Sequence, residues 1–110
     1  MDKTAALSAL SGLGQDTRLE IFRLLVRAGS EGVPAGEIAS RLGAVQNTVS
    51  AHLKVLGHAG LIRSERDGRV IRYRADMIGF RDLLAYLMED CCNGAPELCR
   101  PVITAVTCNC

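Results

Sequence analysis

Two short helical patterns joined by a very tight turn limit what this chain can fold into. Residues 34–42 and 46–58 each carry apolar side chains at helical spacing, and only Gly43, Ala44 and Val45 separate them. Gly43 suits the end of the first helix, and Pro34 suits its first turn. Two short helices joined in this way are typical of a helix-turn-helix.

A hairpin signal follows this pair of helices. Residues 61–65 and 70–74 read as short strands around Asp67 and Gly68, a strong signal for a tight turn. The order of helix, turn, helix and hairpin predicts a mainly α fold with a small β-hairpin, the winged helix-turn-helix, in which the hairpin is the wing.

The remaining segments predict three further helices and a tail. We expect a helix over 4–13, ended by Gly12 and Gly14, and a second helix capped by Asp16. A last helix is expected over 77–92. The apolar stripe of the second helix is expected to be Leu19, Phe22, Leu25 and Val26, and that of the last helix Met77, Phe80, Leu84, Leu87 and Cys91.

The length of 110 residues indicates one domain. We expect it to occupy residues 1–92, with a cysteine-containing tail without regular structure over 93–110. Apolar runs long enough to cross a membrane are missing, as is the pattern of a signal peptide, so a cytoplasmic location is expected. In a reducing compartment, clustered cysteines are more often a ligand set or redox site than a disulfide framework.

All five cysteines of the chain lie between residues 91 and 110, and Cys91, Cys92 and Cys99 fall within nine residues. Clustered thiolates attract zinc, copper(I) or a thiophilic metalloid, or form a disulfide. Cys91 also continues an apolar stripe and could simply pack in the core, since a free cysteine behaves as a small hydrophobic side chain.

The positive charge of the chain is concentrated in its middle. The whole chain has a net charge of only +1, whereas residues 41–74 hold seven basic and two acidic side chains. Such a local basic region is the footprint of a polyanion partner, although a solvated basic face would have the same composition. Together with the helix-turn-helix it predicts binding to double-stranded DNA.

The second helix of the pair supplies the predicted base-reading residues. Placing Val49 and Leu53 inward turns a polar face outward, at about 100° per residue. The amides there suit adenine and the lysine suits guanine or phosphate. Ser50 lies on a flank and is expected to bond a phosphate, whereas His52 either packs, bonds to backbone or touches DNA. The predicted DNA-binding residues of this helix are Gln46, Asn47, Ser50, His52 and Lys54.

The hairpin carries five arginines in twelve residues. Alternate strand residues point to opposite faces, so the five side chains cannot all meet one phosphate strand. Arg66 and Arg69 flank the turn and are the predicted wing contacts. The other arginines are expected to pair with Glu65, with Asp67 or with the last helix.

Several ordered motifs resemble the arsenic-repressor (ArsR/SmtB) family over roughly residues 5–90. They are residues 18–25 (Arg-Leu-Glu-Ile-Phe-Arg-Leu-Leu), 46–56 (Gln-Asn-Thr-Val-Ser-Ala-His-Leu-Lys-Val-Leu), 59–62 (Ala-Gly-Leu-Ile), the Asp67-Gly-Arg wing and Tyr73. The resemblance implies a homodimeric repressor that leaves its operator when an inducer binds. It further implies a dimer interface formed by the first and last helices. DNA binding itself is expected to need no cofactor.

The resemblance leaves the inducer site to be chosen among several that the family uses. Residues 36–42, before the base-reading helix, hold no cysteine, so the family's best-known arsenic site is missing. The zinc site on the last helix needs histidines, and the chain's only two are His52 and His58. The resemblance therefore implies Cys91, Cys92 and Cys99 as ligands, as in the subgroup with a C-terminal arsenite site.

Trivalent arsenic or antimony fits three thiolates, which balance its formal charge. Adjacent helical side chains point about 100° apart, so Cys91 and Cys92 could share one ion only if the end of the last helix is distorted. We hypothesise that this distortion changes the dimer geometry and moves the base-reading helices out of register with the operator. Cys108 and Cys110 are not counted as ligands.

Other readings stay open. The same repressor could sense thiol oxidation, a soft divalent ion such as cadmium, lead or zinc, or a monomethylated arsenical held by two thiolates. An enzyme such as an arsenate reductase is disfavoured, because the chain has neither a C-x-x-C motif nor a C-x5-R phosphate loop, and no histidine lies near the cluster in sequence. A structural zinc knuckle would predict unfolding on chelation.

Overall fold

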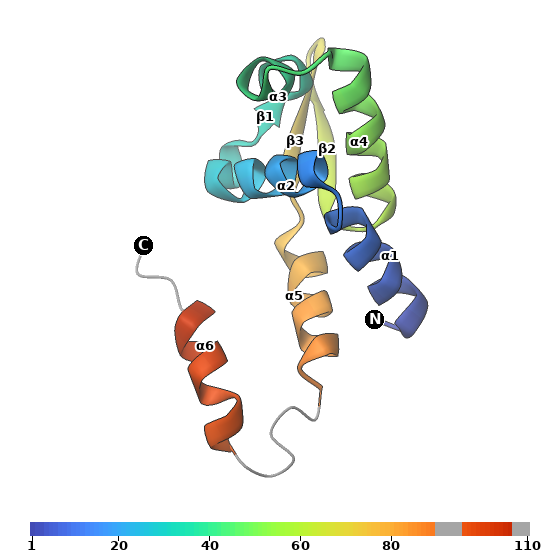
Figure 1. Ribbon diagram of the computed structural model, residues 1–110. Helices are drawn as coiled ribbons and strands as arrows, with labels where there is room; N and C mark the ends of the chain where they lie inside the picture. The colour runs from blue at the N-terminus through green and yellow to red at the C-terminus, as the bar shows by residue number, and fades with distance from the viewer. Residues whose placement is uncertain (90–95, 107–110) are drawn as a thin grey trace.

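The computed structural model describes residues 1–89 and 96–106. It confirms the mainly α architecture with a β-hairpin wing (Figure 1). The elements are α1 (Lys3–Leu13), α2 (Asp16–Ala28), the 3₁₀ turn η1 (Gly29–Glu31), β1 (Val33–Pro34), α3 (Ala35–Leu42), α4 (Gln46–His58), β2 (Ile62–Asp67), β3 (Val70–Ala75), α5 (Met77–Leu87), the 3₁₀ turn η2 (Pro96–Leu98) and α6 (Arg100–Val106).

The helix starts are set by side chains that accept backbone N–H groups. Asp2 Oδ1 accepts the N–H of Ala5 at 2.7 Å and so caps α1. Asp16 does not cap α2 as predicted. Gln15 does so instead, because the helix begins one residue earlier than expected and Gln15 Oε1 accepts the N–H of Arg18 at 2.8 Å.

The wing is part of a three-stranded antiparallel sheet with the order β1-β3-β2. Strand β1 was not predicted from the sequence. It has only two residues, and Pro34, expected in the first turn of α3, is the residue before that helix and pairs with Arg72. Both hairpin strands also extend beyond their predicted ends, to Asp67 and Ala75.

The core lies where α2, α3, α4 and the sheet meet. Its largest fully buried side chains are Ile21, Leu25, Val33, Ile38, Val49, Leu56, Leu61 and Leu83. Within α2 the predicted stripe is partly wrong, because Leu19 and Val26 are 45% and 39% exposed while Ile21 and Leu24 are buried. Gly12, expected to end α1, lies inside it and is buried, where a Cβ would come within 3.3 Å of Ala59 Cβ.

The last part of the chain differs most from prediction. Helix α5 ends at Leu87 and not at Cys92, and only Leu83 of this helix is buried. The hypothesis of a distorted last turn at Cys91 and Cys92 concerns residues outside those that the structure describes. The expectation of an irregular tail was wrong for residues 96–106, which form η2 and α6. In Figure 1, α5 and α6 project below the winged domain.

The start of α5 is fixed tightly to the base of the wing. The N–H of Asp76 donates to the carbonyl of Leu61 at 2.8 Å, and Asp76 Oδ1 accepts the N–H groups of Ile78 and Gly79. A Cβ on Gly79 would overlap the carbonyl oxygen of Gly60. Only glycine therefore allows this approach of α5 to the loop after α4.

We predict that Gly79→Ala destabilises the fold by about 1–3 kcal/mol, because α5 must move away from backbone that cannot give way. The matched control is Gly36→Ala, also inside a helix, where a Cβ would meet nothing within 4 Å. That change should stabilise the fold by roughly 0.5–1 kcal/mol through the lower chain entropy of alanine. Urea unfolding followed by circular dichroism measures both; a Gly79→Ala protein as stable as Gly36→Ala would contradict the packing described here.

Candidate nucleic-acid interface

The turn between α3 and α4 has the predicted residues and a fixed geometry. Gly43 adopts the left-handed conformation at φ 63° and ψ 32°, which favours glycine. Its N–H donates to the carbonyl of Ser40 at 3.2 Å, and the N–H of Ala44 donates to that of Ala39 at 3.0 Å. These bonds close α3 and set the direction in which α4 leaves the turn.

Helix α4 has one buried and one exposed face, as predicted. Val49 and Leu56 have no exposed surface and Leu53 is 2% exposed. Four of the five predicted base- and phosphate-contacting side chains are exposed to solvent, with Asn47 and Lys54 opposite the buried face and Ser50 on its flank: Gln46, Asn47, Ser50 and Lys54. Two of these stand in the first turn, where the helix can enter a groove end-on.

The fifth predicted residue, His52, has different surroundings. It is half-buried, and its Nδ1 lies 3.4 Å from Arg18 Nη1 on α2. The side of α4 that carries His52 therefore faces the start of α2. From the sequence, His52 was expected to pack, to bond to backbone or to touch DNA. In the structure it contacts another side chain of the protein, Arg18.

The wing arginines divide into two groups. Three form ion pairs: Arg63 with Asp76 at 3.9 Å, Arg72 with Asp67 at 3.8 Å, and Arg74 with Glu65 at 2.9 Å. Asp67 and Glu65 are partners expected from the sequence, whereas Asp76, which caps α5, lies just before the helix named in that expectation. Arg74 Nε also donates to the carbonyl of Ser30 at 2.7 Å.

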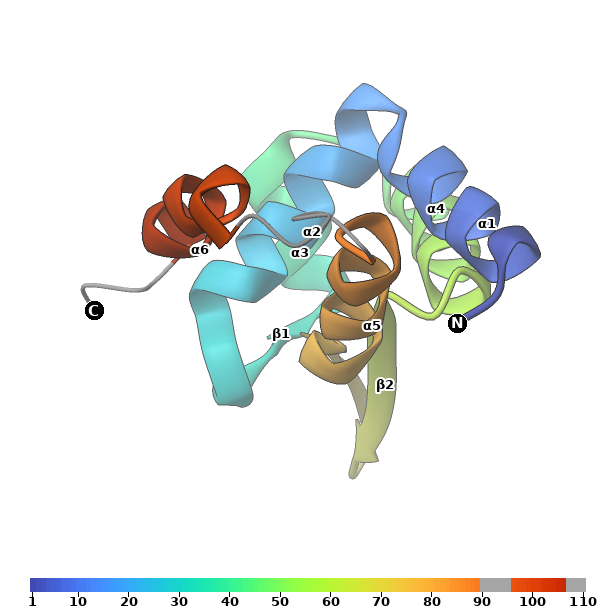
Figure 2. The same cartoon turned by 90° about the horizontal axis from the view of Figure 1, so that it is seen from below.

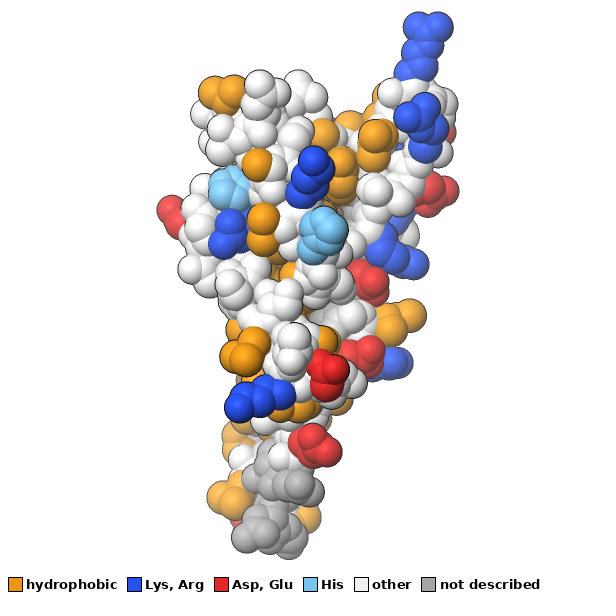
Figure 3. All heavy atoms as spheres, turned by 90° about the vertical axis from the view of Figure 1, so that its right-hand side faces the viewer, with side chains coloured by type: hydrophobic (Ala, Val, Ile, Leu, Met, Phe, Trp, Pro, Cys, Tyr) orange, Lys and Arg blue, Asp and Glu red, His pale blue; other side chains and the backbone are white. Residues whose placement is uncertain are grey.

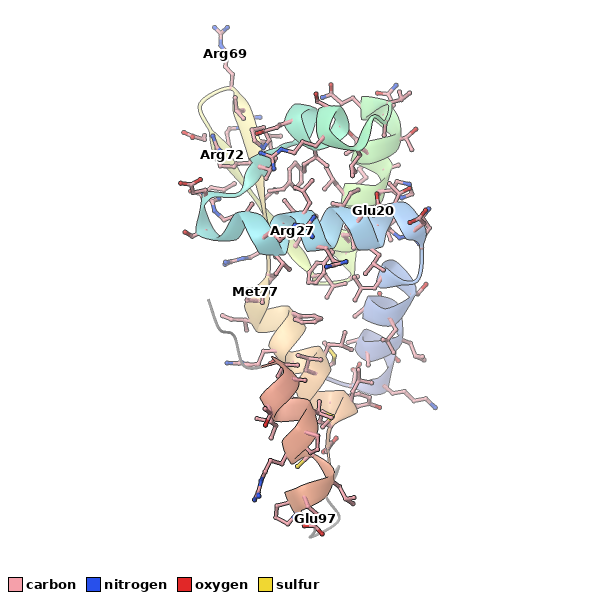
Figure 4. All side chains as sticks on the ribbon, turned by 60° about the vertical axis from the view of Figure 1, so that its left-hand side comes forward. Glu20, Arg27, Arg69, Arg72, Met77 and Glu97 are labelled. Atoms are coloured by element: carbon pink, nitrogen blue, oxygen red, sulfur yellow. The ribbon has the colours of Figure 1, made fainter. Side chains whose placement is uncertain are left out.

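The two arginines predicted as wing contacts are exposed, and within residues 1–89 and 96–106 neither takes part in an ion pair. Arg69 extends from the tip of the hairpin away from the rest of the molecule, whereas Arg72 lies closer to the domain (Figure 4). Arg66 and Arg69 therefore keep their charge available to an anionic partner, while the other three are used within the protein.

A hollow of about 470 Å³ lies between α4 and the wing. Its polar lining comes from Ser50, Lys54, His58, Ser64 and Tyr73. Ser64 and Tyr73 were not predicted as site residues; they are direct partners across β2 and β3. Strand alternation could have found them, since it places both on the face of the hairpin that α4 covers. The face of the molecule that carries α4 shows both histidine and lysine or arginine side chains (Figure 3).

Of the three predicted thiolate ligands, the structure describes only Cys99. Cys91 and Cys92 lie outside the described residues, as do Cys108 and Cys110. Cys99 is 8% exposed and disulfide-bonded. Its Sγ lies 3.6 Å from the carbonyl oxygen of Pro96, a contact only, because a disulfide sulfur has no hydrogen to donate. Within residues 1–89 and 96–106, no three His, Cys, Asp or Glu side chains gather to hold a metal ion.

The helices of the described segments are all too short or too polar to span a membrane.

Comparisons with known proteins agree with this geometry. Residues 13–65 match the family model described as a helix-turn-helix domain. No curated protein sequence matches the chain. An ArsR-like transcriptional regulator from Rhodococcus sp. RHA1 has 26% identity and a TM-score of 0.73, with 97% of this chain and 96% of that chain covered.

Two other solved structures are similar over most of their length. A "possible transcriptional regulator for arsenical resistance" is 30% identical, with 91% of this chain and 98% of that chain covered and a TM-score of 0.61. The homodimeric winged helix-turn-helix DNA-binding domain Mb0332 from Mycobacterium bovis, "a possible ArsR-family transcriptional regulator", is 27% identical, with 82% and 87% covered and a TM-score of 0.61. With the helix-turn-helix, the wing and these relatives, the chain belongs to the ArsR family of winged helix-turn-helix transcriptional regulators.

Proposed function

We propose that this regulator is a repressor that binds operator DNA as a homodimer and is released when trivalent arsenic or antimony binds Cys91, Cys92 and Cys99. The observation that carries the DNA-binding part is the pairing of two features on one surface. The first turn of α4 exposes Gln46 and Asn47, and the neighbouring wing carries Arg66 and Arg69 outside the described ion pairs.

These features suit different parts of a DNA duplex. Amide side chains can form paired hydrogen bonds to adenine edges in the major groove. Arginines on a hairpin tip reach phosphates, which fix the position of the protein and supply salt-dependent affinity without reading sequence. In this assignment α4 reads the operator and the wing holds the backbone beside it.

The homodimer is supported by apolar side chains that one chain leaves uncovered. Leu7 and Leu10 of α1 are 57% and 41% exposed, and Leu84 and Leu87 of α5 are 37% and 50% exposed. Each pair is three residues apart, so each forms a stripe along its helix. Seen from below, α5 lies between α1 and α6 (Figure 2). A second copy that covers these stripes would remove them from water, and one of the relatives named above is a homodimer.

The arsenic site is supported by the chemistry of the donors and by the position of Cys99. Three thiolates within nine residues match a soft trivalent ion. Cys99 directly precedes α6, and its carbonyl accepts the N–H of Ile103 at 3.0 Å. An ion that joins Cys99 to Cys91 and Cys92 would therefore link the start of α6 to the segment that follows α5. One relative bears a name tied to arsenical resistance.

Thiol oxidation is the second candidate signal, favoured by one observation. Cys99 is disulfide-bonded, so its sulfur can meet that of another cysteine. In this second candidate function, a disulfide formed by an oxidant, and not a bound metalloid, links Cys99 to another cysteine. The DNA-binding surface and the dimer would be the same.

The wing assignment predicts a change in salt dependence. Arg69→Gln should weaken binding to a duplex selected by the wild-type protein from a random library, and should lower the slope of log K against log salt by about one. Fluorescence anisotropy at four salt concentrations measures this. The control is Arg81→Gln, an exposed arginine on α5 that pairs with Asp82. Equal slopes for the two variants would remove Arg69 from the DNA contact.

The dimer assignment predicts that Leu87→Asp converts the protein to a monomer. A symmetric dimer carries the change twice and can cover the exposed half of each Leu87, so the lost burial amounts to about 1.5–3 kcal/mol, to which the burial of two charges adds. Sedimentation equilibrium of the free protein measures the mass. The control is Val70→Asp, an apolar wing residue that is 42% exposed and should leave the mass unchanged. A Leu87→Asp protein with the wild-type mass would exclude α5 from the interface.

The inducer assignment predicts that arsenite releases reduced wild-type protein from the selected duplex, but not Cys91→Ser, Cys92→Ser or Cys99→Ser. Serine keeps the size of the side chain and removes the thiolate that the ion needs. Cys110→Ser, the control, should respond like wild type. Release by the thiol oxidant diamide, without a response to arsenite, would favour the second candidate. Turnover of arsenate with a thiol reductant would instead indicate an enzyme.

A further inference from the structure

The Arg18 side chain joins three helices. Its Nε donates to the carbonyl of Gly12 at 2.7 Å, and its Nη2 donates to that of Ser11 at 3.4 Å. Both carbonyls belong to the last turn of α1, where the usual N–H partners four residues on are missing, although the Ser11 carbonyl also accepts the N–H of Gly14 at 3.2 Å. Arg18 thus closes the end of α1 from the first turn of α2.

The remaining nitrogen of the same guanidinium points to the predicted base-reading helix. Arg18 Nη1 lies 3.4 Å from Nδ1 of His52 on α4. A guanidinium can only donate, so a hydrogen bond at this contact requires Nδ1 as the acceptor and the ring N–H on Nε2. Both side chains are half-buried, and the backbone of Arg18 is fixed by the bond from its N–H to Gln15 Oε1. The contact therefore joins two well-anchored groups.

A second contact with α4 is made at the same last turn of α1. A Cβ on Gly12 would come within 3.3 Å of Ala59 Cβ, just after α4, so α1 lies directly against α4 there. His52 is seven residues before Ala59, about two helical turns. Two points along α4, about two turns apart, therefore both connect to the last turn of α1, one through Arg18 and the other directly.

We propose that Arg18 is a positioning residue for DNA recognition: through His52 it holds α4 at a fixed angle to α1. This rests on the proposed function, in which α4 reads the operator and α1 faces the second copy. A shift of α1 within the dimer would then be carried to the reading helix through Arg18. It also gives His52 a role inside the protein in place of a DNA contact.

A double-mutant cycle in DNA affinity tests the proposal. Arg18→Lys keeps the charge and can still reach an α1 carbonyl, but one ammonium cannot serve both helices. His52→Leu removes the acceptor, and His52→Asn retains one, Oδ1, near the position of Nδ1. We expect Arg18→Lys and His52→Leu each to weaken binding to the selected duplex roughly tenfold, and the double variant to bind no more weakly than either, because both remove one interaction.

Rescue by His52→Asn, with near wild-type affinity, is the result that a general loss of packing would not give. Additive effects in the double variant would overturn the proposal. So would His52→Asn binding as weakly as His52→Leu while Arg18→Lys binds normally, since His52 would then touch DNA itself.

Thermal unfolding of each variant separates misfolding from mispositioning. If Arg18→Lys fails to fold, the comparison of His52→Leu with His52→Asn decides alone. Wild-type protein that binds no duplex would instead reject the proposed function, and this inference with it.

Discussion

The thirteen residues of helix α4 must both pack against the core and present polar side chains to solvent, and the rest of the structure depends on this double requirement. Val49, Leu53 and Leu56 pack in the core, so α4 cannot rotate about its axis without exposing them to water. The polar side chains on the other face are consequently held at fixed angles to the rest of the domain. Burial of apolar surface is the main force that stabilises the fold. It therefore also sets the orientation of the predicted base-reading side chains of α4.

The wing and α5 are held to this helix by a small set of polar contacts. Asp76 caps α5, pairs with Arg63 on β2 and bonds through its N–H to Leu61. Gly79 brings α5 into backbone contact with Gly60, directly after α4. In the proposed function, α5 faces the second copy of the chain, so a change of dimer geometry would reach the wing and α4 through this short junction.

Much of the winged domain could be predicted from the sequence, because it depends on local patterns. Turn chemistry at Gly43 and Gly68, and helical spacing of apolar residues, place α3, α4 and the hairpin. Strand β1 was missed since two residues carry no periodic signal, and Gln15 was missed as a cap because Asp16 is the stronger cap by residue type.

The expected apolar stripes of α2 and α5 were partly wrong. The spacing of apolar residues along a helix does not show which of these side chains stay exposed to solvent in the folded chain. Leu84 and Leu87 have helical spacing, yet α5 buries only Leu83 in the single chain. The pairing of Arg72 with Asp67 and Arg74 with Glu65 followed from charge and proximity in the hairpin. The contact of His52 with Arg18 did not, because it joins residues 34 apart through tertiary packing.

Native mass spectrometry of the reduced protein with its selected duplex, before and after addition of arsenite, tests the central claim most directly. It counts chains, DNA and arsenic in one particle. The proposed function predicts two chains on one duplex before arsenite, and afterwards free DNA with a protein dimer that carries one arsenic per chain. A particle that holds arsenic and still holds the duplex, or a single chain on the duplex, would contradict it.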